Sequence, residues 1–101
     1  MIALTAETTI LLATKPADFR KGIDGFVALC RDQLKQNTRS GTWFVFINRN
    51  KTMMRILVWD HTGFWLMTKR LSKGKFSGWP KDHHLINTVD ARSLSQLLSG
   101  C

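Results

Sequence analysis

The sequence predicts an α+β fold in which two helices pack on an antiparallel β-meander sheet. Several short segments combine β-branched and aromatic residues and have turn residues at their ends, which is typical of strands. Two other segments carry apolar residues three and four positions apart, which is typical of amphipathic helices. The expected order is a strand, a helix, four strands and a second helix, which favours helices laid on an antiparallel sheet.

Length and composition limit the classes of protein to which this chain can belong. Its 101 residues predict a single domain, residues 1–101, and 44% hydrophobic and 22% charged residues are ordinary for a globular protein. No apolar run reaches the roughly 18 residues that cross a bilayer, and no basic stretch precedes the first apolar one. We therefore expect a cytoplasmic protein without a membrane segment.

The first strand is expected over Thr8–Thr14, which is apolar and β-branched and ends at Lys15-Pro16. Asp18 then offers a side-chain cap for a helix over Phe19–Gln36. The apolar face of this helix consists of Ile23, Phe26, Val27, Cys30 and Leu34. Cys30 is expected to fill the core, so we do not expect a structural disulfide.

Three strands joined by short turns are expected in the middle of the chain, over Trp43–Ile47, Met54–Trp59 and Phe64–Leu71. The connections Asn48–Thr52 and Asp60–Gly63 are rich in residues that favour tight turns. Consecutive strands joined by tight turns pair in the antiparallel sense, which is the reason for predicting a meander.

Two further elements are expected near the C-terminus. Leu85–Val89 is a short apolar stretch that fits one more strand. Asp90 can cap a last helix over Ala91–Ser99, in which the leucines lie on one side, and Gly100 supplies a stop signal.

The distribution of charge is the strongest functional signal in the chain. Between Arg49 and Lys81, eight basic residues meet one acidic residue, Asp60, so this window carries +7 of the net charge of +8. Because the window also contains strands, the charge is expected to lie on a sheet edge and loop and to attract a polyanion, most simply nucleic acid. The predicted nucleic-acid-binding residues are Arg49, Lys51, Arg55, Lys69, Arg70, Lys73, Lys75, Lys81 and Trp79.

Three of the candidate residues have competing interpretations. Trp79 can stack on an unpaired base, or it can pack beneath the basic loop. Arg20 and Lys21 lie in the first turn of the expected helix, where cations oppose the helix dipole, so a bound phosphate would offset that repulsion. Asp18 and Asp24 offer internal partners that would do the same.

The sequence predicts no catalytic or metal site. His83 and His84 are adjacent, so they point in different directions in an extended chain, and no cysteine or carboxylate pair completes a metal site. Asp60 and His61 lack a positioned nucleophile. Asp18 and Asp24 are separated by about 600° of helical rotation, so they do not share a face. We therefore expect no cofactor and no enzymatic activity.

The order of several separated motifs resembles the TnpB family, the small accessory proteins encoded by the second open reading frame of insertion sequence 66 elements. The resemblance covers Ile10 to about Leu98. It rests on Pro16 to Gly25 (PADFRKGIDG), Ser40-Gly41 before Phe44-Val45-Phe46, Leu57 to Asp60 (LVWD) with Gly63, and Lys69-Arg70-Leu71 with Gly74, Phe76, Trp79 and Pro80. It implies a bacterial protein that acts in transposition and DNA recombination beside a separate, larger transposase, without an established enzymatic mechanism.

Two functions are open from the sequence. In the first, the basic residues contact phosphates of DNA, expected to be the element ends, with little base specificity. In the second, the basic sheet margin and Trp79-Pro80 dock an acidic surface of the transposase without binding DNA. A continuous positive face would favour DNA, and scattered or neutralised cations would favour docking.

Overall fold

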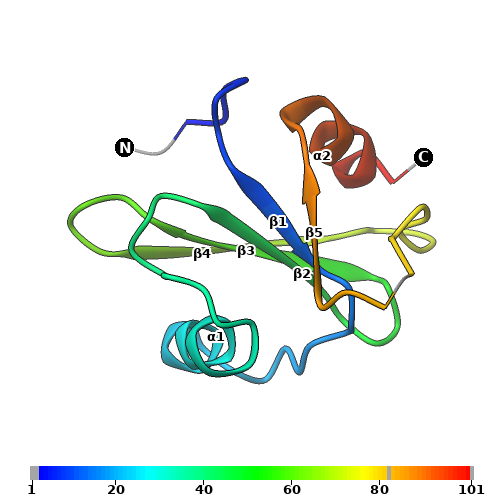
Figure 1. The fold of residues 1–101 in the computed structure, drawn as a ribbon. Helices are drawn as coiled ribbons and strands as arrows, with labels where there is room; N and C mark the ends of the chain where they lie inside the picture. Colours follow the sequence, from blue (N-terminus) through cyan, green and yellow to red (C-terminus); the bar gives the residue numbers. More distant parts are fainter. Residues whose placement is uncertain (1–2, 82, 101) are drawn as a thin grey trace.

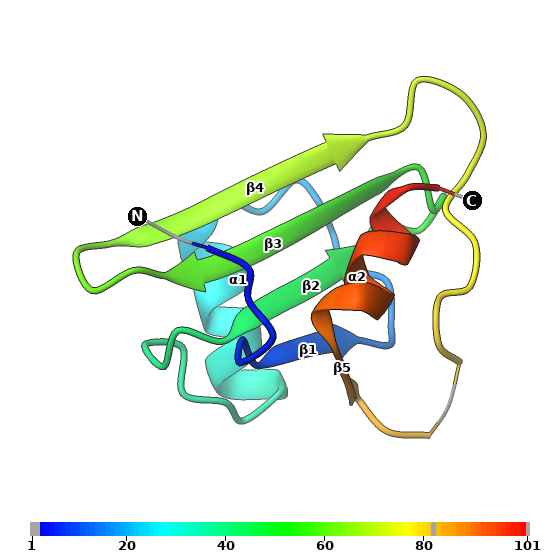
Figure 2. The same cartoon turned by 90° about the horizontal axis from the view of Figure 1, so that it is seen from above.

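The computed structural model describes residues 3–81 and 83–100. These residues form a five-stranded sheet with one helix on each face, seen edge-on in Figure 1 and from above in Figure 2. The strands lie in the order β4-β3-β2-β1-β5, and the α+β class is the one that the sequence predicts. The elements are β1 (Ile10–Ala13), α1 (Ile23–Ala28), a π-helical turn η1 (Leu29–Gln33), β2 (Trp43–Ile47), β3 (Met53–Trp59), β4 (Phe64–Arg70), β5 (Ile86–Val89) and α2 (Ala91–Leu98).

The sheet is mixed, so the prediction of an antiparallel sheet is wrong on this point. β1 runs parallel to β2, with Leu11 opposite Phe44, whereas the pairs β1–β5, β2–β3 and β3–β4 are antiparallel. The parallel pair arises because the chain leaves β1, crosses one face of the sheet through α1 and enters β2 in the same direction. A crossover of this length leaves no tight-turn signal in the sequence.

Two hydrophobic layers hold the helices on the sheet. The layer on the α1 side is built by Ala13, Phe26, Cys30, Phe44, Phe46 and Leu57. The layer on the α2 side contains Leu94 together with alternate residues of β1, β2 and β3. Both faces of β2 are therefore covered, and all five of its residues are buried. Burial on both faces explains why this strand is a continuous apolar run.

The first helix begins at Ile23, later than the expected start at Phe19. The carbonyls of Phe19 and Lys21 accept hydrogen bonds from Arg55 Nη1 and so turn away from helical geometry. Asp18 does not cap the helix as predicted, because its carboxylate accepts hydrogen bonds from the backbone and the guanidinium of Arg20. The contact with β3 therefore sets the start of α1.

The second helix follows its sequence signals closely. Asp90 is the N-cap, and its Oδ1 accepts a hydrogen bond from the backbone N–H of Ser93 at 2.8 Å, which lowers the pKa of Asp90. Gly100 has a φ of +76° and provides the left-handed residue that follows the helix. Within the described ranges no helix is long and apolar enough to cross a membrane.

Candidate nucleic-acid interface

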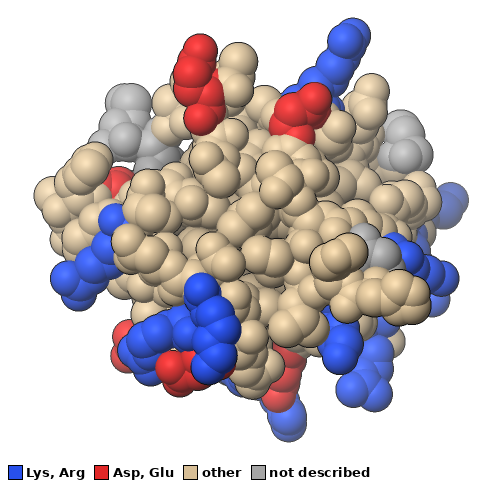
Figure 3. Space-filling view, viewed as in Figure 1, with Lys and Arg blue, Asp and Glu red and all other residues tan. Residues whose placement is uncertain are grey.

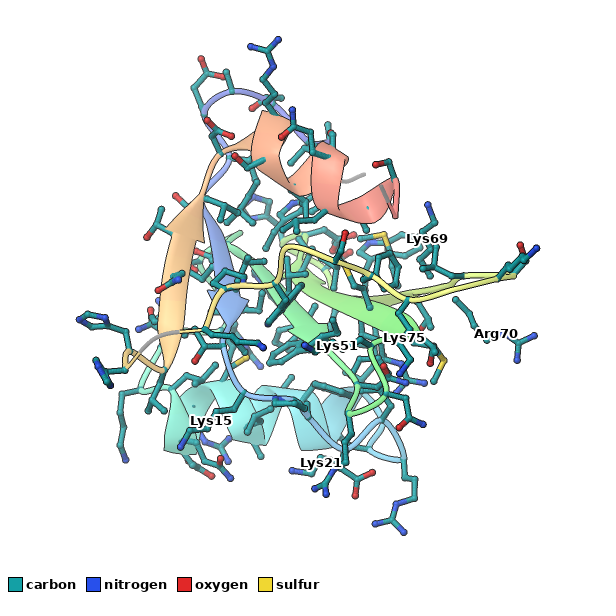
Figure 4. All side chains as sticks on the ribbon, turned by 90° about the vertical axis from the view of Figure 1, so that its right-hand side faces the viewer. Lys15, Lys21, Lys51, Lys69, Arg70 and Lys75 are labelled. Atoms are coloured by element: carbon teal, nitrogen blue, oxygen red, sulfur yellow. The ribbon has the colours of Figure 1, made fainter. Side chains whose placement is uncertain are left out.

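One end of the sheet gathers most of the cations that the sequence singles out. Given the strand directions, the last residues of β1, β2 and β4 lie at the same end as the first residues of β3 and β5. We call this end, with the loops that leave it, the basic end, and Figure 4 looks onto it. Its Lys and Arg residues are Lys15, Arg49, Lys51, Lys69, Arg70, Lys73, Lys75 and Lys81.

Backbone hydrogen bonds join two loops of the basic end. The N–H of Leu71 donates to the carbonyl of Thr52 at 3.0 Å, and the N–H of Phe76 donates to the carbonyl of Lys51 at 2.7 Å. The Phe76 side chain is buried and anchors the loop in the core. The β2–β3 turn and the loop after β4 therefore form one surface, where Lys51 and Lys75 appear together in Figure 4.

The cations of this surface lack acidic partners in the described part of the chain. The salt bridges of residues 3–81 and 83–100 are Arg20–Asp18 and Arg31–Asp32, and neither includes a cation of the basic end. The acidic residues before β1, between β3 and β4 and after β5 lie at the opposite end of the sheet. Along the right-hand margin of Figure 3, Lys and Arg atoms are visible, and no Asp or Glu of the described residues is seen there. Among the described residues, these cations thus lie at one end of the sheet, and none of them forms a salt bridge with an acidic side chain.

Arg55 lies on the α1 side of β3, and its guanidinium is bound inside the fold. Nη1 donates to the carbonyls of Phe19 at 2.6 Å and Lys21 at 3.0 Å, and Nε donates to Thr68 Oγ1 at 2.8 Å. The guanidinium also lies 4.9 Å from the ring centre of Phe19 and 5.8 Å from that of Phe26. Arg55 holds the segment before α1 against the sheet, so it is not part of the surface proposed below.

Trp79 is buried on the α2 side of the sheet. Its side chain is 8% exposed, its Nε1 donates to the carbonyl of Ala13 at 3.1 Å, and it packs in the same layer as Leu94. A base could stack on this ring only by displacing these contacts. The structure therefore favours packing over base stacking for Trp79.

Lys69 connects the sheet to the second helix. Its Nζ donates to the carbonyl of Leu98, the last residue of α2. A cation at this position satisfies a carbonyl that the helix leaves unpaired and is favoured by the helix dipole. The neighbouring Arg70 is exposed at the end of β4. The two adjacent cations therefore have different surroundings.

Arg20 and Lys21 lie beside the basic end, in the segment that leads to α1. The Arg20 guanidinium binds both carboxylate oxygens of Asp18, which raises the pKa of Arg20 and lowers that of Asp18. Arg20 and Arg49 line one groove of about 680 Å³, while Lys21 lines a separate hollow with Lys15. Asp18 is thus the internal partner of Arg20 that the sequence suggests, although the Arg20 side chain is exposed.

Lys15 belongs to the basic end but is absent from the residues predicted from the sequence. It lies two residues after the end of β1, so its position depends on the direction of that strand. An antiparallel β1–β2 pair would have placed Lys15 at the opposite end of the sheet. A correct prediction of the direction of β1 would have placed Lys15 at the basic end.

The chain matches the family model described as IS66 Orf2 like protein over residues 8–101. The chain belongs to this family. Membership confirms the resemblance that the motifs indicate and supports an accessory role in insertion-sequence transposition. The IS66 Orf2-like family is not a known catalytic family.

Two relatives of this IS66 Orf2-like protein come from the bacterium Sinorhizobium fredii. The uncharacterized protein y4jC is 40% identical over 76 residues, which make up 75% of this chain and 65% of y4jC. The chain thus spans somewhat less than two thirds of the length of that relative. The uncharacterized protein y4hO is 33% identical over 91 residues, which make up 90% of this chain and 78% of y4hO. No solved structure matches this chain.

The turn at the opposite end of this IS66 Orf2-like protein uses the Asp60 carboxylate for structure. Oδ2 accepts a hydrogen bond from the indole N–H of Trp65 at 2.6 Å, and Oδ1 accepts bonds from Thr62 and from the N–H of Gly63. The Trp65 bond first, and then the Thr62 and Gly63 bonds, hold the pKa of Asp60 well below its usual range. Across the described ranges, no three His, Cys, Asp or Glu residues lie together in a way that could hold a metal ion.

Replacing Asp60 with asparagine is expected to flatten the acid side of the stability profile. The pKa of Asp60 is lower in the folded state than its unfolded value of about 3.9, so the carboxylate stabilises the fold above that pH. This contribution is lost as the pH falls through the folded pKa. The free energy of unfolding, measured by urea denaturation from about pH 5 to pH 2, should therefore fall more steeply with falling pH for the wild type than for Asp60→Asn.

Glu7→Gln is the matched control for this measurement. Glu7 is an exposed residue at the same end of the sheet, and within residues 3–81 and 83–100 its hydrogen bond comes from its backbone N–H, which donates to Thr5, and not from its carboxylate. This variant should keep the steep acid profile of the wild type. Equal profiles for the wild type and Asp60→Asn would show that the turn does not depend on the charge of Asp60.

Proposed function

We propose that this protein is an accessory factor of transposition that binds DNA in the bacterial cytoplasm, at the element ends, through its basic end. The observation that carries the proposal is the gathering of exposed cations without acidic partners at one end of the described sheet. A surface of one sign attracts and orients a polyanion. The proposed contacts are Arg49, Lys51, Arg70, Lys73 and Lys75, flanked by Lys15, Lys69 and Lys81.

The proposed partner is duplex DNA, contacted at its phosphates. Phe76 and Trp79, the aromatic residues of the loop after β4, are both buried, so neither supports stacking on unpaired bases. The cations are carried on turns and strand ends, and Lys and Arg there position DNA without reading its sequence. About five such contacts would give a log-log salt dependence near −4.5 on duplex DNA. The proposal assigns no catalysis to this chain.

The test is a salt titration of DNA binding by the double variant Lys73→Ala/Lys75→Ala. Loss of two phosphate contacts should reduce the magnitude of the salt slope by about 1.8 and weaken binding near 0.1 M salt on the order of 10- to 60-fold. Fluorescence anisotropy with a labelled duplex of the element end measures both quantities. Unchanged binding by the double variant would remove this loop from the interface.

The control variant Arg39→Ala/Arg92→Ala removes the same charge from the opposite end of the sheet. The Arg39 guanidinium lies 4.7 Å from the ring centre of Trp59, and Arg92 is exposed in the first turn of α2. This variant should keep the wild-type salt slope. An equal loss in both variants would mean that net charge alone drives binding, without a defined surface.

The competing function, docking on the transposase, is a distinct outcome of the same experiment. A wild-type protein that binds no duplex near 0.1 M salt but co-purifies with the transposase would support docking instead. Loss of that co-purification in Lys73→Ala/Lys75→Ala would then assign the basic end to an acidic surface of the partner.

A further inference from the structure

The outer edge of β4 is open along its whole length. β4 is the first strand of the sheet order, pairs with β3 on one side, and has no neighbouring strand on the other side within the described chain, as Figure 2 shows. It has seven residues without proline or glycine, whereas β5 at the other edge has four. A long, unbroken edge strand is a ready template for pairing with another strand.

The direction of the free backbone groups of β4 follows from two hydrogen bonds. The N–H of Leu71 donates to Thr52 and the N–H of Asp60 donates to Gly63, so Leu71 and Gly63 face β3. Backbone groups alternate in an antiparallel pair, and therefore every second residue between them faces outward. The outward N–H and C=O groups belong to Phe64, Leu66, Thr68 and Arg70.

The side chains of β4 divide between the two faces of the sheet. Met67 packs on the α2 side, so Trp65 and Lys69 share that face, while Leu66 and Phe64 pack on the α1 side. Trp65 is 48% exposed, although its indole N–H is held by Asp60 at 2.6 Å. An ordered aromatic ring is thus half exposed on the open edge strand.

We propose that β4 pairs with β4 of a second copy of this chain in the antiparallel sense, with Met67 opposite Met67 on a two-fold axis. Outward-facing residues then meet each other, Phe64 opposite Arg70 and Leu66 opposite Thr68, as a hydrogen-bonded ladder requires. Trp65 lies opposite Lys69 on the α2 side. The result is a continuous ten-stranded sheet with α2 of both copies on one face.

Strand overlap and charge together select this register among those that the backbone allows. Centring the pair on Met67 overlaps all seven residues and places each cation opposite an aromatic ring, which attracts a cation across neighbouring strands. Centring on Lys69 or Arg70 would put like charges directly opposite. Centring on Thr68 or Leu66 would leave two residues of each strand beyond the partner strand. Further along, the register brings the Asp60 turn of one copy toward the basic loop of the other.

Sedimentation equilibrium at about 0.15 M salt, which limits repulsion between like-charged copies, tests the association. We expect a reversible monomer–dimer equilibrium for the wild type without DNA. Trp65→Lys removes the ring and places two lysines opposite each other, so it should weaken the dimer at least about tenfold. A wild type that is monomeric at every reachable concentration would overturn the proposal.

Leu85→Lys is the matched control for Trp65→Lys. Leu85 is another exposed apolar side chain, 44% exposed, and it lies next to the opposite edge strand, β5. This variant should dimerise like the wild type. Dissociation by Leu85→Lys with no effect of Trp65→Lys would assign the contact to β5 and overturn the proposal.

A cysteine cross-link tests the register separately. In a Cys101→Ser background, which leaves the buried Cys30, Met67→Cys should form a disulfide-linked dimer on oxidation because this residue faces its own copy. Thr68→Cys, whose partner would be Leu66, should cross-link poorly. Efficient cross-linking at residue 68 with little at residue 67 would overturn the Met67 register.

Discussion

Replacing Trp79 with alanine is expected to lower the free energy of unfolding by about 3–5 kcal/mol, the usual cost of removing a large buried aromatic side chain. The ring is 8% exposed and fills the layer beneath α2, so its removal leaves a cavity that the sheet cannot close. It also leaves the carbonyl of Ala13 without its indole donor. Urea denaturation followed by circular dichroism measures the loss.

Two further variants separate the contributions at this site. Trp79→Phe keeps most of the packing but not the N–H donor, so it should cost about 1–3 kcal/mol. Trp65→Ala removes the half-exposed ring of β4 and should cost far less than Trp79→Ala, about 1 kcal/mol. A loss below about 1 kcal/mol for Trp79→Ala would show that the ring is not a core residue and would restore base stacking as its role.

Elements with local signals could be predicted from the sequence, and those fixed by distant contacts could not. β2 matches its predicted range because a continuous apolar run bounded by turn residues has few alternatives. α2 begins where Asp90 supplies a side-chain cap. The start of α1 depends instead on Arg55, more than thirty residues away in the sequence. The apolar periodicity predicts a helix that begins at Phe19. The Arg55 guanidinium instead binds the carbonyls of Phe19 and Lys21, which the first helical turn would use.

The residues of the candidate site also divide into those with a local signal in the sequence and those whose surroundings are fixed by distant contacts. The exposure of the basic loop around Lys73 and Lys75 could be predicted from charge alone, since a cation in an exposed loop needs no tertiary contact to stay exposed. Charge alone also places Arg55 in the predicted DNA-binding set, because a count of charges does not distinguish loops from strands. Its position between Met54 and Ile56 in an apolar strand is a signal that the side chain has internal partners.

Replacing Arg55 with methionine is expected to lower the free energy of unfolding by about 2–4 kcal/mol, because hydrogen bonds to a charged donor are stronger than neutral ones. Methionine keeps an apolar stem of similar length, but the carbonyls of Phe19 and Lys21 lose their donor and Thr68 loses its partner. The segment that leads to α1 would then be held by fewer contacts. Urea denaturation measures the change, with Arg49→Met, at an exposed turn residue, expected within about 0.5 kcal/mol of the wild type.

The same two variants distinguish a structural cation from a DNA-binding one. Under conditions where both are folded, Arg49→Met should reduce the magnitude of the salt slope of duplex binding by about 0.9, whereas Arg55→Met should leave it unchanged. Arg55→Met should therefore change stability but not the salt slope, and Arg49→Met should change the salt slope but not stability. A reduced slope with wild-type stability for Arg55→Met would mean that its guanidinium contacts phosphate in solution and leaves the carbonyls before α1.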